Sequence, residues 1–97
     1  MSEDAPTVRL DVWLWRARFF KTRSLSSAAV TKRGVRITRH GQTRRTDKPS
    51  ALASPGDVLT FTRARRIEVV EVVAVGERRG PAREAAELYK RLGEADD

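Results

Sequence analysis

The chain has 97 residues, of which 39% are hydrophobic, and a formal net charge of +7. This length allows one small domain with a thin core and is too short for a two-domain enzyme that encloses a cofactor. The sequence has no cysteine, which excludes disulfide bridges, thiol catalysis and zinc sites built on cysteine. No apolar run approaches the roughly 20 residues that a membrane helix needs. The lack of cysteine is compatible with the cytoplasm, and we expect no association with a membrane.

The charge is concentrated in one part of the chain. Residues 9–48 carry 12 Lys and Arg against two acids, a net charge of +10, whereas residues 49–97 carry eight basic and nine acidic residues. A field of one sign attracts polyanions and speeds encounter with them. A basic surface kept for solubility is the alternative, but solubility alone does not require the charge to be segregated. The distribution therefore favours an anionic partner.

The first predicted elements are a flexible tail at residues 1–8 and a helix that begins near Leu10. Leu10, Trp13, Leu14 and Ala17 follow the i, i+3, i+4, i+7 spacing of one helical face, which predicts that they are buried. Trp15 lies off this stripe. It either packs under the C-terminal helix or offers its ring to a nucleic-acid base.

A second helix is predicted after a short connection. Thr22 or Ser24 can cap its N-terminus, and the helix runs to about Arg33. Its expected buried residues are Leu25, Ala28, Ala29 and Val30. Gly34 stands where a helix C-terminal glycine is expected.

Short strands follow in the second half of the chain. Residues 35–38 alternate, with Val35 and Ile37 facing the core and Arg36 facing solvent. Further strands are predicted near 42–45, at 58–62 after the Pro-Gly-Asp turn at 55–57, and at 67–75 with a bulge between Val69 and Val70. A C-terminal helix is then predicted from Gly80-Pro81.

The apolar stripe of that last helix would be Ala85, Leu88, Tyr89 and Leu92. The order of elements predicts an α+β fold, in which two N-terminal helices pack on a small, twisted, mostly antiparallel sheet that is joined by a C-terminal helix.

The sequence shows no recognisable catalytic set. His40 is the one histidine and lies in a polar stretch, and no glycine-rich phosphate loop is present. Asp11 is better suited to an ion pair or a helix cap, and Asp57 to a turn, than to catalysis. We therefore expect no enzymatic activity, no cofactor and no metal.

The basic residues form a more informative pattern. Lys21 and Arg23 precede or open the second helix, Lys32 and Arg33 close it, and Arg36 follows on the next strand. Guanidinium groups grip phosphate oxygens in a fork, and helix N-terminal amides also suit a phosphate. Arg39, Arg44, Arg45 and Lys48 extend the basic stretch. The pattern predicts contact with the phosphates of an anionic partner.

Several separated motifs resemble a known RNA-binding module. The motifs are Arg9-Leu10-Asp11-Val12-Trp13-Leu14, Lys21-Thr22-Arg23-Ser24, Gly34-Val35-Arg36-Ile37 and the turn from Pro55 to Leu59. In this order they resemble the alpha-L motif of small-subunit ribosomal protein S-four. The resemblance implies an RNA-binding domain at 9–62, with residues 63–97 as a strand and helix extension packed on the same domain.

Two further segments resemble a narrower family. Trp13-Leu14-Trp15 with Ala17-Arg18-Phe19, and the tail from Arg78 to Tyr89, are similar to the bacterial fifteen-kilodalton heat-shock proteins. That family implies a cytoplasmic protein that binds ribosomal RNA of the large ribosomal subunit. We expect the free protein to be a monomer. Its implied role is to act on free large subunits that hold a stalled nascent chain on peptidyl transfer RNA, in heat shock or ribosome quality control.

These arguments together assign a set of RNA-contacting residues. The set is Arg9, Lys21, Thr22, Arg23, Ser24, Lys32, Arg33, Arg36, Arg39, Arg44 and Lys48. Two alternatives stay open: a basic adaptor that binds an acidic protein, and an RNA-binding appendage of an RNA-modifying enzyme such as a pseudouridine synthase. DNA is a further possible ligand, because phosphate contacts alone do not distinguish it from RNA.

Overall fold

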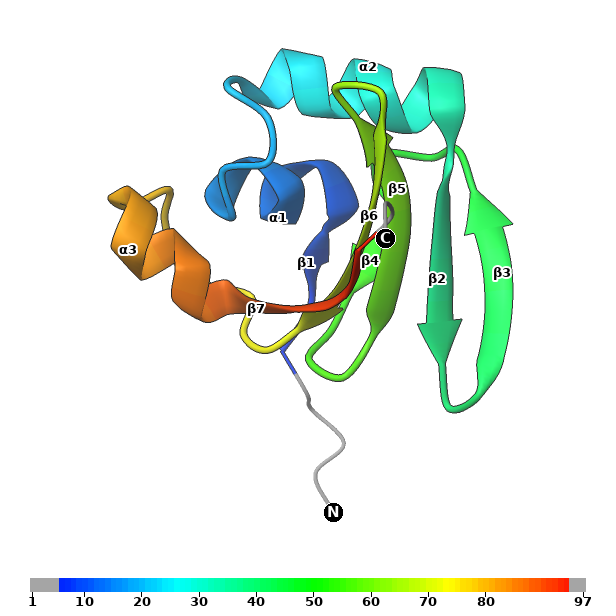
Figure 1. Ribbon diagram of the computed structural model, residues 1–97. Coiled ribbons are helices and arrows are strands. Elements are labelled where there is room, and N and C mark those ends of the chain that lie inside the picture. Colours follow the sequence, from blue (N-terminus) through cyan, green and yellow to red (C-terminus); the bar gives the residue numbers. More distant parts are fainter. Residues whose placement is uncertain (1–5, 95–97) are drawn as a thin grey trace.

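The computed structural model describes residues 6–94 and confirms the α+β fold. Two helices lie against one side of a five-stranded antiparallel sheet of order β3-β2-β5-β6-β7, and strands β1 and β4 form a separate pair (Figure 1). The elements are β1 (Val8–Arg9), α1 (Leu10–Arg16), α2 (Arg23–Arg33), β2 (Val35–Arg39), β3 (Gln42–Thr46), β4 (Leu52–Ala53), β5 (Val58–Arg63), β6 (Arg66–Val72), α3 (Ala82–Ala85), the 3₁₀ helix η1 (Ala86–Leu88) and β7 (Tyr89–Glu94).

Helix α1 lies at the centre of the core, as its stripe predicted. Leu10, Trp13 and Leu14 are fully buried. The indole Nε1 of Trp13 donates a hydrogen bond to the carbonyl of Ala74 at 2.9 Å, so the buried ring carries no unpaired donor. Trp15 is half-buried, and the guanidinium of Arg79 lies 6.0 Å from its ring centroid. Arg79 belongs to the loop before α3, so the predicted packing of Trp15 under the C-terminal helix itself stays a prediction.

Helix α2 begins and ends where predicted, but its buried face differs. The hydroxyl of Thr22 accepts a hydrogen bond from the amide of Leu25 at 3.0 Å, so Thr22 rather than Ser24 is the cap. The predicted burial of Leu25 is wrong, since 53% of it is exposed. Val30 is buried as predicted, Ala28 and Ala29 are only partly buried, and Ser26 is buried although the sequence did not indicate it. Ser26 can enter the core because its hydroxyl donates to the carbonyl of Asp11 at 2.8 Å.

The predicted strands after α2 are confirmed with small changes of length. Val35 and Ile37 are buried and Arg36 is exposed. The predicted run at 67–75 is shorter, because β6 ends at Val72. The register of β6 against β7 shifts between Val69 and Val70, which confirms the predicted bulge.

A C-terminal helix is present as α3 and continues into η1, but it ends earlier than predicted. Tyr89 begins strand β7, which pairs with β6, so the predicted helical stripe through Leu92 is wrong. Leu88 is buried whereas Leu92 is 47% exposed. The outer edge of β6 offers unpaired backbone groups, and pairing with them outweighs the helical spacing of the side chains.

The last third of the chain packs closely on the first. Arg16 Nη1 donates to the carbonyl of Gly76 at 2.7 Å, and Arg18 Nε donates to that of Gly80 at 2.7 Å. The division into a tail at 1–8, a domain at 9–62 and an extension at 63–97 stays a prediction. Residues 1–5 lie outside the described residues, and Val8 pairs with Ala53 in the β1–β4 ladder.

Candidate nucleic-acid interface

The predicted basic residues gather at the two ends of helix α2. Lys21 and Arg23 lie at its N-terminus, Lys32 and Arg33 at its C-terminus, and all four side chains are exposed. The helix has 11 residues, which separates its ends by about 15 Å. Two groups of cations therefore stand far enough apart to contact different phosphates of one polyanion.

The N-terminus of α2 has the electrostatics of an anion site. Its first turn carries no acidic residue, so the positive end of the helix dipole is not offset. Lys21 and Arg23 add full positive charges beside it, and Ser24 is exposed in the first turn. The Thr22 hydroxyl is already engaged as the cap, so it supports the helix end more directly than it serves a ligand. This end of α2 can hold a phosphate.

The strands divide the remaining cations between two faces of the sheet. Arg36 of β2 lies opposite Arg45 of β3, and directly opposed side chains share a face. Arg44 lies opposite Ile37, whose side chain is buried in the core, so Arg44 belongs to the other face. The structure therefore places Arg45 on the same face as Arg36 and places Arg44 on the opposite face.

Two of the predicted contact residues already have acidic partners. Arg9 makes a bidentate pair with Asp11, with both contacts at 3.0 Å, which confirms the ion-pair role of Asp11. This pairing raises the pKa of Arg9, chiefly through the side-chain hydrogen bond. Arg39 makes a bidentate pair with Asp57 at 2.8 and 2.7 Å. These two arginines are thus partly neutralised, unlike Arg23 and Arg36, for which no ion pair occurs among residues 6–94.

The Arg39–Asp57 pair fastens the turn before β5 to the end of β2. Asp57 is 2% exposed, and its Oδ2 also accepts a hydrogen bond from the amide of Ser54 at 2.9 Å. The hydrogen bonding of Arg39 to the Asp57 carboxylate raises the pKa of Arg39 above its ordinary value. These contacts confirm that Asp57 holds the turn before β5 in place, as the sequence predicted.

Replacing Asp57 with alanine should therefore destabilise the fold by about 2–3 kcal/mol, because the Arg39 charge and the Ser54 amide both lose their acceptor. The estimate lies below that for a fully buried pair, since 39% of the Arg39 side chain is exposed. Urea unfolding measures the change, with Asp47→Ala, at an exposed acid, as the control. Equal stabilities of the two variants would contradict this role.

The β5–β6 hairpin brings cations that the sequence did not indicate. Strand β5 contacts α2, and the hairpin reaches the level of that helix in Figure 1. Ala64 and Arg65 form its tight turn with φ of 51° and 67°, and Arg65 and Arg66 are exposed. The surrounding residues 49–97 are nearly neutral, so charge counting along the chain could not identify this hairpin. The feature of the sequence that could have indicated this basic hairpin is the pair Arg65 and Arg66 between the two predicted strands.

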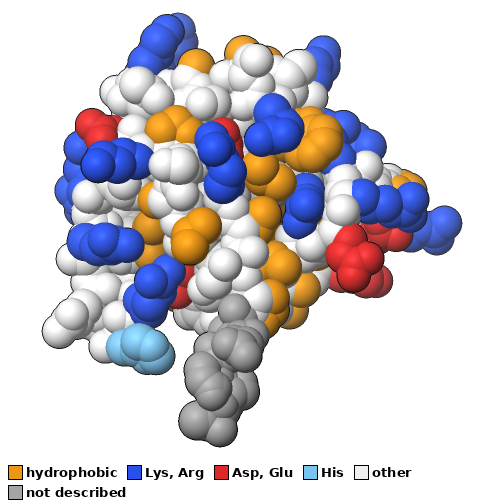
Figure 2. Space-filling model, turned by 180° about the vertical axis from the view of Figure 1, so that it is seen from behind, with side chains coloured by type: hydrophobic (Ala, Val, Ile, Leu, Met, Phe, Trp, Pro, Cys, Tyr) orange, Lys and Arg blue, Asp and Glu red, His pale blue; other side chains and the backbone are white. Residues whose placement is uncertain are grey.

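The space-filling view shows how the charges are distributed. In Figure 2, Lys and Arg side chains lie at the α2 end and along the side that descends to the histidine, with few acidic side chains among them. The largest group of acidic side chains lies on the opposite side, beside further basic ones. On this face the acidic side chains are therefore less evenly distributed than the basic ones.

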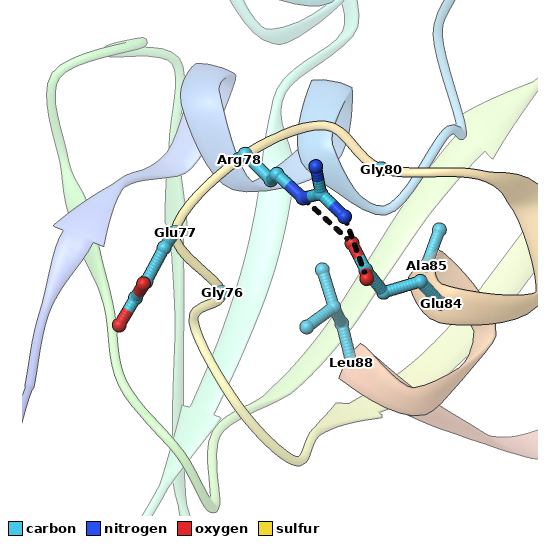
Figure 3. Close-up of a pocket in the computed structure, with 7 residues that line it drawn as sticks. All are labelled: Gly76, Glu77, Arg78, Gly80, Glu84, Ala85 and Leu88. Atoms are coloured by element: carbon cyan, nitrogen blue, oxygen red, sulfur yellow. Dashed lines mark hydrogen bonds and ion pairs between the residues drawn. The ribbon is translucent and has the colours of Figure 1, made fainter.

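A pocket of about 260 Å³ lies between α3 and the loop before it (Figure 3). Arg78 and Glu84 face each other across it, with both hydrogen bonds at 3.0 Å. Because its cation is already paired with an acid, this pocket is a poor anion site. The hydrogen bond from Arg78 lowers the pKa of Glu84, and the same bond raises the pKa of Arg78.

The Arg78–Glu84 pair should make a small contribution to the free energy of unfolding, and this contribution should depend on pH. The folded-state pKa of Glu84 lies below its ordinary value, so the contribution is present above that ordinary value and is lost as the pH falls through the folded pKa. Carbon-detected NMR titration of the Glu84 carboxyl measures its pKa. Arg78→Gln should return it toward the ordinary value, and an unchanged pKa in that variant would contradict the pairing.

Two further features of the described part of the chain concern metal sites and membrane-spanning helices. Within residues 6–94, no three His, Asp or Glu side chains stand close enough to hold a metal ion. None of the helices in this range has the length and apolar character needed to cross a membrane.

The fold and its charges define a small α+β domain whose cations cluster around one capped helix. No family model matches the chain. It is 40% identical over 91 residues to heat shock protein 15 of Escherichia coli, covering 94% of this chain and 65% of that protein. The homologue of Haemophilus influenzae is 35% identical over 83 residues, covering 86% of this chain and 60% of that one.

A solved structure of the same name as these relatives also matches the chain. Heat shock protein 15 of Vibrio cholerae, described as trimeric, matches with a TM-score of 0.71 and 31% identity, covering 93% of this chain and 86% of that one. The chain belongs to the heat shock protein 15 family. It spans about 65% of the length of the Escherichia coli relative.

Proposed function

We propose that this chain binds structured RNA and docks on ribosomal RNA of the large ribosomal subunit. The observation that carries the proposal is the segregation of charge. Residues 9–48 hold a net charge of +10, and exposed cations stand at both ends of α2. Solubility alone would not require cations to gather around one helix, whereas a phosphate backbone would favour such an arrangement.

The docking mechanism makes and breaks no covalent bond, so we propose no enzymatic activity. Lys21, Arg23 and the N-terminus of α2 contact one part of the RNA backbone, and Lys32 and Arg33 contact another. A-form RNA is recognised largely by shape and backbone contacts, since its deep major groove is too narrow for side chains to read. A rigid helix with cations at a fixed spacing suits such recognition.

The ribosomal target and the cellular role are the more specific part of the proposal. The alpha-L resemblance favours a ribosomal target over other RNAs, and the heat shock protein 15 relatives favour a role in heat shock. We propose that the protein acts in the cytoplasm, as a monomer when free, on large subunits that hold a stalled nascent chain. Contact with peptidyl transfer RNA belongs to the same proposal.

Binding measured by fluorescence anisotropy at several salt concentrations tests the RNA proposal. A folded fragment of large-subunit ribosomal RNA should bind more tightly than duplex DNA of equal length at the same salt, with an affinity that falls linearly in log–log form as salt rises. Equal affinity for both nucleic acids would contradict recognition of RNA shape. Weak binding to both, with tight binding to an acidic protein, would favour the adaptor alternative.

A further inference from the structure

A second basic site lies on the outer face of the sheet, away from α1. It is a pocket of about 300 Å³ where the C-terminus of α2 meets strands β2, β3, β5 and β6. Three arginines from three elements, and no acidic residue, line it; we call it the arginine pocket. Its lining includes Arg33, Arg36, Arg45, Thr60, Thr62 and Ile67.

The arrangement of these arginines costs stability in the free protein. Arg36 and Arg45 are directly opposed across the β2–β3 ladder, and like charges in that position repel each other. Among residues 6–94, none of the three arginines of the pocket forms an ion pair with an acid. An anion bound between them would relieve the repulsion, so the pocket suits a negatively charged ligand.

Local geometry also holds one of these arginines in place. Arg45 Nη2 donates to the carbonyl of Arg33 at 3.3 Å. Its guanidinium lies over Gly34, where an added Cβ would stand 2.5 Å from Nη2. Gly34 has φ of +78°, which ends α2 and leaves room for this close approach. A guanidinium fixed before binding loses less freedom when it grips a ligand.

We propose that the arginine pocket binds one phosphate group of the RNA backbone, separately from the phosphate at the N-terminus of α2. The inference rests on the proposed function and deepens it. The Thr60 hydroxyl adds a neutral donor beside Arg36, its neighbour across the β2–β5 ladder. Ile67, 53% exposed, supplies an apolar wall that suits a ribose or a base.

The separation of the two sites predicts how the RNA lies on the protein. The ends of α2 stand about 15 Å apart, which is farther than two neighbouring phosphates of one strand lie from each other. The two phosphates are therefore several nucleotides apart or belong to different strands. The bound RNA runs along α2 and turns onto the outer face of the sheet.

NMR titration of the whole chain with inorganic phosphate tests the pocket directly. The amide signals of Gly34, Arg45 and Thr60 should shift and saturate together. Arg45→Gln should weaken this binding about tenfold, the effect of losing one charge-assisted contact. Arg44→Gln is the matched control, because it removes the same charge from the same strand on the other face. Equal binding by the two variants, or no shift at these amides, would overturn the proposal.

A second arm uses the ribosomal RNA fragment and separates this proposal from the proposed function. Arg45→Gln should flatten the salt dependence of RNA binding by about 0.7–0.9 in slope, while its melting temperature stays at or above that of the original chain. An unchanged slope, with RNA binding otherwise intact, would overturn the pocket as an RNA site. Failure of the unaltered chain to bind RNA, with phosphate shifts still present, would instead refute the proposed function.

Discussion

Replacing Trp13 with alanine should lower the free energy of unfolding by about 3–5 kcal/mol, the largest loss expected from a single substitution in this chain. The side chain is fully buried, and its indole joins α1 to the segment after β6 through the bond to Ala74. Small domains have about 5–15 kcal/mol of stability in total. The variant should therefore unfold at a much lower urea concentration.

Two control variants separate the packing of Trp13 from its hydrogen bond. Trp13→Phe keeps most of the ring but removes the donor to Ala74, so it should cost about 1–2 kcal/mol. Trp15→Ala removes an equal side chain that is only half-buried, and should cost less than Trp13→Ala. Equal losses for Trp13→Ala and Trp15→Ala would show that the core is not centred on Trp13.

The triple substitution of Lys21, Arg23 and Arg36 by alanine should have the largest effect on function. The affinity for ribosomal RNA should fall by about 100- to 1000-fold, and the salt slope should flatten by about 2–3. All three side chains are exposed, and none forms an ion pair within the described part of the chain. The melting temperature should therefore change little, since no acid loses its partner.

A second triple variant tests whether position or total charge controls this binding. Substituting Arg78, Arg83 and Lys90 by alanine removes the same charge from exposed positions in the C-terminal third. This variant should keep an affinity close to that of the original chain. If both triple variants bind equally weakly, binding depends on net charge, and the surface around α2 is not the site.

Local signals predicted the first half of the fold well. The stripe from Leu10 to Ala17 gave α1, and the Thr22 cap and Gly34 set the limits of α2. These features act within a few residues, so the sequence displays them directly. The β7 strand and the burial of Ser26 depend on contacts with distant elements. The helical spacing from Ala85 to Leu92 does not show that the backbone of this segment pairs with the edge strand β6.

The candidate site was predicted less completely, for the same physical reason. The exposure of Arg23 and Arg36 followed from their places on a helix and a strand. The pairing of Arg39 with Asp57, 18 residues away, depends on the fold and removes much of the free charge assigned to Arg39. The strand register also decides that Arg45 rather than Arg44 faces Arg36. The assignment of RNA contacts to all of these residues stays a prediction.

Sedimentation of a cell lysate through sucrose gradients tests whether the protein docks on the large ribosomal subunit. After translation is interrupted, the protein should migrate with free large ribosomal subunits at low salt and leave them as salt rises, because its contacts are to phosphates. The Lys21, Arg23 and Arg36 triple variant should stay at the top of the gradient. An unaltered protein found at the top at every salt concentration would contradict docking on the large subunit.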